Sequence, residues 1–293
     1  MSTANSARNL FKLNRSARPS SLRRQAIWLL LLTVLLWSTS GLFVKIINWQ
    51  ALSILSARSM IAAVVFLIYL RQLNLRWSRL QIVGALGYVG TNLFFIMGTK
   101  VTTAANVIFL TYTAPLYVVL FGYWLLAERP QRPDWLTMPF IFAGMLLFFG
   151  DDLSLDGFRG NLFGALSGLS MAVMILCMRR QKAGTPANTI LLGNLFGIFI
   201  GLPSLLHETF SLPSVGIILY LGIFQIGISF VFYSIAIKHL QALESTLLLT
   251  LEPILNPLWV FLVIGEVPGQ LAFVGGGLVL GAVIARAMMS ART

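Results

Sequence analysis

The sequence predicts an all-α polytopic membrane protein, with ten transmembrane helices that form two inverted five-helix repeats around a central cavity. Three observations predict this fold: the composition, a series of ten apolar segments, and a repeat that relates the two halves of the chain. Hydrophobic residues make up 57% of the 293 residues and charged residues 10%, and the mean hydropathy is +0.85. This composition excludes an ordinary soluble domain.

The apolar segments follow one another with short connections, which leave no room for an extramembrane catalytic or receptor domain. A helix needs about 20 mainly apolar residues to cross a bilayer. The segments show no strict alternation of polar and apolar residues, so helices are favoured over a β-barrel. The expected spans are 27–47, 53–70, 80–98, 104–126, 134–150, 160–178, 187–206, 214–236, 242–264 and 269–287.

These spans divide the chain into five parts. A basic cytoplasmic tail covers residues 1–26 and the first five-helix repeat covers 27–150. An acidic external linker, 151–159, leads to the second five-helix repeat, 160–287, and to a short cytoplasmic tail, 288–293. The first tail is too polar for the apolar region of a signal peptide, so we expect the first span to be retained.

An internal repeat relates the two halves at an offset of 138 residues, with seven identities in a 31-residue window. The identical pairs are Lys100 and Lys238, Ala104 and Ala242, Leu110 and Leu248, Pro115 and Pro253, Leu120 and Leu258, Glu128 and Glu266, and Pro130 and Pro268. Because each half has five spans, an odd number, the second copy enters the bilayer from the opposite side. Inverted repeats are typical of secondary transporters, whose substrate site lies near the midplane where the halves meet.

The net charge of +12 is distributed asymmetrically between the two sides of the membrane. With alternating topology, 17 of the 21 lysines and arginines fall on one side, in the tails and in the loops that follow the even-numbered spans. The positive-inside rule places this side, with both termini, in the cytoplasm. This distribution argues against a nucleic-acid partner, whereas the basic tail suits contact with anionic membrane lipid.

Polar and aromatic side chains recur at helical spacing on several spans. Polar groups are costly in lipid, so they normally face the bundle interior or a wet cavity. A single aromatic or methionine is explained as well by core packing, but together they predict a mostly apolar cavity for a small molecule with a small polar head. The expected cavity residues are Trp37, Ser40, Tyr88, Asn92, Tyr112, Ser170, Met174, Gln225, Ser229, Tyr233, Glu252 and Asn256.

Two prolines occupy matching positions inside the fourth and ninth spans, Pro115 and Pro253. Each removes an intrahelical hydrogen bond and frees the carbonyl four residues earlier, those of Thr111 and Leu249. Two interpretations remain open, a static kink and a hinge on which half of a helix swings.

Glu252 is an isolated carboxylate well inside a span, which must be paired, hydrated or protonated. It could receive a substrate ammonium group or carry a coupling proton, or it could be a structural acid bonded to neighbouring helices. Lys45 and Arg58 are the possible charge partners within the spans. Arg58 could instead bind a substrate carboxylate, and Lys45 could extend its ammonium group to the membrane surface.

Enzyme and channel functions find no support in the sequence. The single cysteine, Cys177, and the two histidines, His207 and His239, form no metal-ligand spacing, so we expect no metal and no cofactor. No nucleophile with an adjacent base marks an intramembrane enzyme. No filter sequence or repeated pore acid marks a channel.

Several short motifs in this order resemble those of one family. They are Trp37-Ser38-Thr39, Ala57-Arg58, Ala114-Pro115, Ala127-Glu128-Arg129-Pro130, Glu252-Pro253 and Gly265-Glu266. With the repeat, they make residues 27–287 resemble the drug/metabolite transporter superfamily in its EamA branch, and within it the YddG-type aromatic amino-acid exporters.

The resemblance implies a basket of ten helices, with the first, third, fourth, sixth, eighth and ninth around a central cavity in a bacterial inner membrane. It implies alternating-access export of aromatic and other neutral amino acids, with efflux of organic cations or drugs as the alternative. Related sugar-phosphate translocators carry Lys-Arg where this chain has Leu251-Glu252, so a phosphorylated substrate is not expected. Each chain holds both repeats, so a monomer would suffice.

Overall fold

The computed structural model describes residues 20–70, 78–126, 132–151, 154–180, 186–236, 239–240, 245 and 248–290. Helices make up every regular element of this described part, so the all-α prediction is confirmed there. The first half contains α2 (Ser20–Ser38), α3 (Ser40–Ile46), α4 (Ala51–Leu70), α5 (Arg79–Val101), α6 (Ala104–Thr111), α7 (Ala114–Leu126) and α8 (Arg132–Asp151). The second half contains α9 (Leu155–Arg180), α10 (Pro186–Leu205), α11 (Leu212–Tyr220), η1 (Leu221–Ile228), α12 (Ser229–Ala236), α14 (Glu252–Ile264) and α15 (Gln270–Ser290).

In this part of the chain, eight helical stretches are long and apolar enough to cross a membrane. They correspond to all predicted spans except the fifth and the ninth, which fall on shorter apolar helices at Asp134–Phe148 and Glu252–Ile264. Parts of the predicted tails and linker and the start of the ninth span lie outside the described residues, as do Glu128, Pro130, Lys238 and Ala242 of the repeat.

Several predicted spans are not continuous helices. The first divides at Thr39 into α2 and α3, a break that we did not predict. The hydroxyls of Ser38 and Thr39 donate to the carbonyls of Leu35 and Leu36, at 2.9 and 2.7 Å. Such side-chain bonds to the preceding turn bend helices. The eighth span contains the π-helix η1 between α11 and α12, an uncommon element that often occurs at functional sites.

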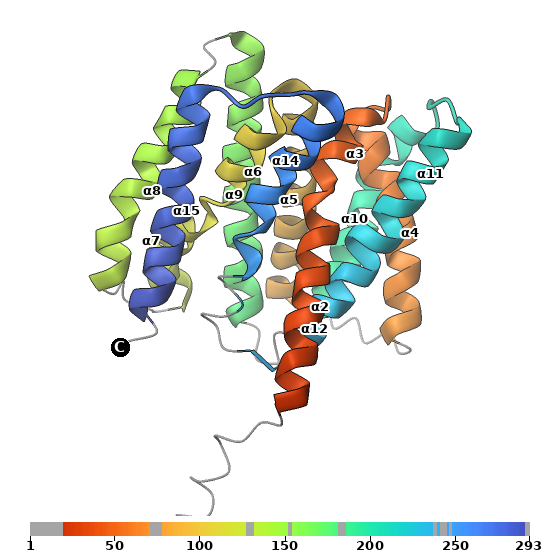
Figure 1. The fold of residues 1–293 in the computed structure, drawn as a ribbon. Helices are drawn as coiled ribbons and strands as arrows, with labels where there is room; N and C mark the ends of the chain where they lie inside the picture. The colour runs from red at the N-terminus through yellow and green to blue at the C-terminus, as the bar shows by residue number, and fades with distance from the viewer. Residues whose placement is uncertain are drawn as a thin grey trace, which may run out of the picture.

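The helices pack as one bundle, with α5 against α9, α4 against α10, and α8 against α15 (Figure 1). Gly87 allows the close contact of α5 with α9, since a Cβ atom there would lie 2.7 Å from the backbone nitrogen of Met174. Small residues at such crossings let helices approach where no hydrophobic force drives them together. The first turn of α2 and the last turn of α15 lie at the same end of the bundle (Figure 1).

Candidate functional site

A cavity of about 400 Å³ lies inside the bundle, a size typical of small-molecule sites. Residues from both halves line it, including α2, α4, α5 and α6 from the first and α9, η1, α12 and α14 from the second. Of the residues predicted to line a cavity, the structure brings together Trp37, Ser40, Tyr88, Asn92, Tyr112, Met174, Gln225, Tyr233 and Glu252. Arg58 and Pro115 also line it.

Three other predicted cavity residues, Ser170, Ser229 and Asn256, do not line the cavity but lie behind residues that do. Ser229 accepts a hydrogen bond of 2.7 Å from Trp37 Nε1. Asn256 donates to Ser40 Oγ at 3.2 Å. Ser170 packs where α9 crosses Gly90 of α5. These residues support the wall from behind. The polar face of a helix is wider than the part of that face that reaches the cavity, so helical spacing alone predicted too many lining residues.

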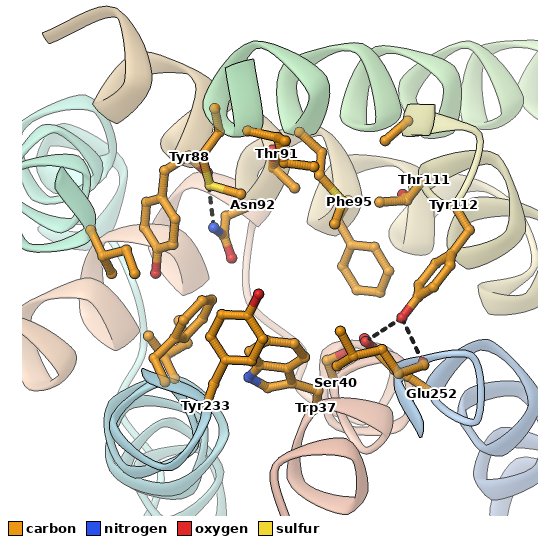
Figure 2. Close-up of a pocket in the computed structure, with 18 of the residues that line it drawn as sticks. Trp37, Ser40, Tyr88, Thr91, Asn92, Phe95, Thr111, Tyr112, Tyr233 and Glu252 are labelled. Carbon is orange, nitrogen blue, oxygen red and sulfur yellow. Dashed lines mark hydrogen bonds between the residues drawn. The ribbon is translucent and has the colours of Figure 1, made fainter. Parts of the chain in front are cut away.

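Aromatic rings from α2, α5 and α12 line the cavity on facing sides. Trp37 packs on Phe230 and Tyr233, with ring centroids 4.8 and 5.4 Å apart. Tyr88 packs on Phe230 edge-on at 5.9 Å. Figure 2 shows Tyr88 and Asn92 facing Tyr233 and Trp37 across the cavity. These rings offer apolar area for a substrate side chain.

Sequence reasoning missed several lining residues. They are apolar side chains toward the middle and one end of the helices: Phe66, Met178, Ala187, Ile190, Ile226, Phe230 and Val283. In spans that are apolar almost throughout, such residues carry no contrast that distinguishes a cavity wall from packed core or lipid-facing surface.

A polar group at one wall is centred on Arg58, which is only 1% exposed. Its Nη2 donates to Asn92 Oδ1 at 2.6 Å, and Asn92 Nδ2 donates to the Tyr88 carbonyl at 2.9 Å. In the described part of the chain Arg58 Nε has no hydrogen-bond partner, nor does Oε1 of Gln225. The wall thus holds a guanidinium whose hydrogen-bonding capacity is only partly used.

Glu252 lies at a different part of the wall, beside the helix break at Pro253. The Tyr112 hydroxyl lies 2.8 Å from Glu252 Oε2 and 3.0 Å from the carbonyl of Leu249 (Figure 2). Leu249 is the residue whose carbonyl Pro253 was predicted to free. A single phenolic proton therefore serves two acceptors, the carboxylate and the freed carbonyl.

The charge pairing that we considered for Glu252 is absent among the described residues. Lys45 Nζ instead pairs with Glu266 Oε2 at 2.6 Å, and Arg58 bonds to Asn92. Lys45 lies beyond the break at Thr39, so α3 carries its side chain to the end of the bundle where α14 ends. The spacing of residues along the helices could not predict which acid each cation would contact, because lysine and arginine side chains reach several ångströms from their backbone.

The helix breaks predicted at the two prolines are confirmed. Residues 112–113 separate α6 from α7, and a turn at Thr250 and Leu251 precedes α14. Pro115 and Pro253 each occupy the second position of the new helix, where the absence of an N–H costs nothing. The Thr113 hydroxyl donates to the Leu110 carbonyl at 2.6 Å and so satisfies part of the first break.

Beyond Ser40, three layers of contacts join α14 to α2, α3 and α6; we call them the closure. In the layer nearest the cavity, Trp259 Nε1 donates to Ser38 Oγ at 2.9 Å, and Asn256 to Ser40. Next come the apolar side chains of Leu42, Ala104 and Val260.

The outermost layer of the closure is ionic. Besides its pair with Glu266, Lys45 donates to the Thr102 carbonyl at 2.8 Å. Glu266 Oε1 accepts from the backbone N–H of Ala104, also at 2.8 Å. The closure therefore holds α14 against the first half of the chain at this end of the bundle, whereas Met178, Ala187 and Ser234 extend the cavity lining toward the opposite end.

The described residues contain no group of three or more histidine, cysteine, aspartate or glutamate side chains that could hold a metal ion. Cys177 is a free, buried cysteine on α9. In this part of the chain, a molecule bound in the cavity therefore interacts with the charged and polar side chains that line it.

A bundle of apolar, membrane-length helices around a mostly apolar cavity is typical of a membrane transporter. The sequence matches the EamA-like transporter family over residues 24–150 and again over 158–286, so the chain belongs to this family. The first match ends within α8 and the second within α15.

The individual relatives share about a quarter of their residues with this chain. The chain is 26% identical over 298 residues to the threonine/homoserine exporter RhtA of Escherichia coli strain K12, covering 94% of this chain and 95% of that protein. It is 26% identical over 277 residues to an uncharacterized transporter of Archaeoglobus fulgidus, covering 85% and 92%. A solved crystal structure shares the fold with a TM-score of 0.65 at 20% identity, over 92% of this chain and 100% of that one. Family and relatives are transporters, which agrees with the prediction that the protein is not an enzyme.

Proposed function

We propose that this protein exports small amphipathic metabolites, above all aromatic and other neutral amino acids, by alternating access. The observation that carries the proposal is the cavity, whose aromatic and methionine walls enclose a few polar groups, among them Arg58, Asn92 and Glu252. Such a lining suits an apolar side chain with a compact polar head. The similarity to a threonine/homoserine exporter supports amino acids as the substrate class.

The alternative is efflux of organic cations or drugs. Glu252, with no ion pair among the described residues, and the rings of Trp37 and Tyr233 favour it, because aromatic faces and carboxylates attract cations. Arg58 argues against it, since a fixed positive charge in the same cavity repels a ligand that carries only positive charge.

Counterflow into liposomes that contain the purified protein tests the function. We expect Phe, Trp, Tyr, Met and Leu to exchange faster than Lys, Asp and phosphorylated sugars. Burial of an apolar side chain is favourable by about 25 cal/mol per Å², whereas the lining cannot neutralise a second charge. Faster exchange of methyl viologen than of every amino acid would support the alternative, and a preference for dianions would contradict both.

We propose that two inverted five-helix repeats, 27–150 and 160–287, build the bundle as ten transmembrane helices in a monomer. The helix contacts support this arrangement. The first and eighth spans meet through α2 and α12, and the third and sixth meet through α5 and α9. Exchange of the two halves converts one of these contacts into the other, as a pseudo-two-fold axis in the membrane plane requires.

We propose that the protein lies in a bacterial inner membrane with both termini in the cytoplasm and the linker 151–159 outside. The distribution of lysine and arginine supports the orientation, and the bacterial exporter relatives support the membrane. In this orientation the closure lies on the outer side, and the cavity extends toward the cytoplasm. The structure then corresponds to an inward-facing state that receives a substrate from the cell.

We propose that the helix breaks at Pro115 and Pro253 act as hinges between the inward- and outward-facing states. Pro115→Ala and Pro253→Ala should each slow counterflow more than they lower the yield of folded protein, because alanine supplies an N–H that can bond to the carbonyl four residues earlier and so join the two helical segments into one stiffer helix. Pro139→Ala is the matched control, since this proline lies inside α8 with its side chain exposed on the outside of the bundle. Wild-type counterflow rates in both hinge variants would leave only static kinks.

A further inference from the structure

Arg58 is the least explained charged group in the bundle. It is 1% exposed and lies halfway along α4, and no carboxylate pairs with it in the described part of the chain. A buried charge is normally paired or fully hydrogen-bonded, because the transfer of an ion from water to a protein interior is unfavourable. Here one Nη group bonds to a neutral amide, that of Asn92, and Nε bonds to none of the described residues.

The unused donor has the geometry for one class of ligand. Nε–H and the neighbouring Nη group form one edge of the planar guanidinium, and this fork binds both oxygens of a carboxylate through parallel hydrogen bonds. The Nη group on this edge is Nη2, which gives one of its two hydrogens to Asn92 Oδ1, and Asn92 is itself held through Nδ2 by the Tyr88 carbonyl at 2.9 Å. The side chain is therefore oriented before a ligand arrives.

An unused acceptor lies on the adjacent helix. Gln225 of η1 lines the same cavity, is 7% exposed, and its Oε1 has no hydrogen-bond partner among the described residues. The two helices are in close contact at this level, since a Cβ atom on Gly222 would lie 3.0 Å from the Arg58 carbonyl. Three residues beyond Gly222, the wider turn of the π-helix presents Gln225 on the cavity side.

From these observations we infer that Arg58 and Gln225 form the subsite for the head group of an α-amino acid, with Arg58 binding the carboxylate and Gln225 Oε1 accepting from the ammonium group. An α-amino acid carries both groups on one carbon, so it satisfies a donor and an acceptor that lie on neighbouring helices. Its side chain then reaches the rings of Trp37, Phe230 and Tyr233. The inference rests on the proposed function and adds a requirement to it: the substrate must carry a carboxylate.

Three ligands that share one ring test this requirement on the wild-type protein. L-phenylalanine has both head groups, 2-phenylethylamine lacks the carboxylate, and 3-phenylpropionate lacks the amine. Measured by competition against phenylalanine counterflow, the amine should bind at least about tenfold more weakly than phenylalanine, a difference of about 1.4 kcal/mol. Equal competition by the amine would overturn the inference without touching the proposed function, whereas absence of counterflow for every amino acid would overturn both.

Substitutions of Arg58 and Gln225 test which group of the substrate each residue binds. Arg58→Lys keeps the charge but removes the planar fork, so the KM for phenylalanine should rise at least about tenfold, while inhibition by 2-phenylethylamine stays as in wild type. Gln225→Leu should weaken the binding of phenylalanine and leave inhibition by 3-phenylpropionate unchanged. Arg159→Lys, on an exposed residue of α9, is the matched control and should behave as wild type. Wild-type KM in a folded Arg58→Lys protein would overturn the assignment, and the ligand comparison decides if that variant does not fold.

Discussion

Replacement of Glu252 by glutamine is expected to leave the protein folded but to reduce counterflow per folded molecule at least about tenfold, equivalent to about 1.4 kcal/mol. Glutamine retains an oxygen that accepts the Tyr112 hydrogen bond of 2.8 Å, so the contact between α14 and the α6–α7 break persists. What it removes is the only negative charge that lines the cavity in the described part of the chain. Arg58 then lacks a compensating charge in the same cavity, and no exchangeable carboxyl proton remains.

Tyr112→Phe is the complementary variant. It keeps the charge of Glu252 but leaves that carboxylate and the Leu249 carbonyl without their donor. An unsatisfied buried acceptor costs about 1–3 kcal/mol, so this variant should lower the melting temperature and leave the rate per folded molecule nearly intact. Thermal unfolding and counterflow measured on both variants separate charge from packing. A destabilised Glu252→Gln protein with a normal rate would show that Glu252 is a structural acid.

Glu266→Gln is expected to open the outer side of the protein. The carboxylate holds Lys45 at 2.6 Å and the Ala104 N–H at 2.8 Å, and glutamine keeps an acceptor for the second but loses the charge for the first. Loss of a charge-assisted hydrogen bond is worth about 1.5–3 kcal/mol, which shifts the equilibrium toward the outward-facing state about tenfold or more.

The shift can be measured as cavity access. In a Cys177→Ser background, Thr91→Cys places a thiol on the cavity wall. An impermeant maleimide added outside intact cells should label it about tenfold faster when Glu266→Gln is also present. Asp156→Asn is the matched control, since Asp156 forms an exposed pair with Arg159 at 3.8 Å, and such pairs contribute little. An unchanged labelling rate would contradict the assigned role of the closure.

The same reagent tests the orientation. A thiol introduced by Asp156→Cys, at the start of α9, should react from outside intact cells, because the acidic linker is proposed to face outward. Labelling of this position only after lysis would place the linker in the cytoplasm. The closure would then lie on the inner side, and the structure would correspond to an outward-facing state.

Much of the candidate site could be predicted because a membrane interior penalises polar atoms. Asn92, Gln225 and Glu252 could not face lipid, so each had to point into the bundle, and all three line the cavity. Apolar lining residues such as Phe230 and Ile190 could not be found in this way, since burial in protein and exposure to lipid favour the same side chains.

The sequence by itself determined the helical class, the places where eight spans run, and the breaks at Pro115 and Pro253, since apolar length and a missing N–H act within a few residues of chain. Only the tertiary structure decided the partners. Glu252 bonds to Tyr112, 140 residues away, and Lys45 pairs with Glu266 rather than with Glu252. Which groups meet depends on where helices cross and on how α3 turns after Thr39. Those crossings are set by packing across the whole bundle, which no local pattern in the chain encodes.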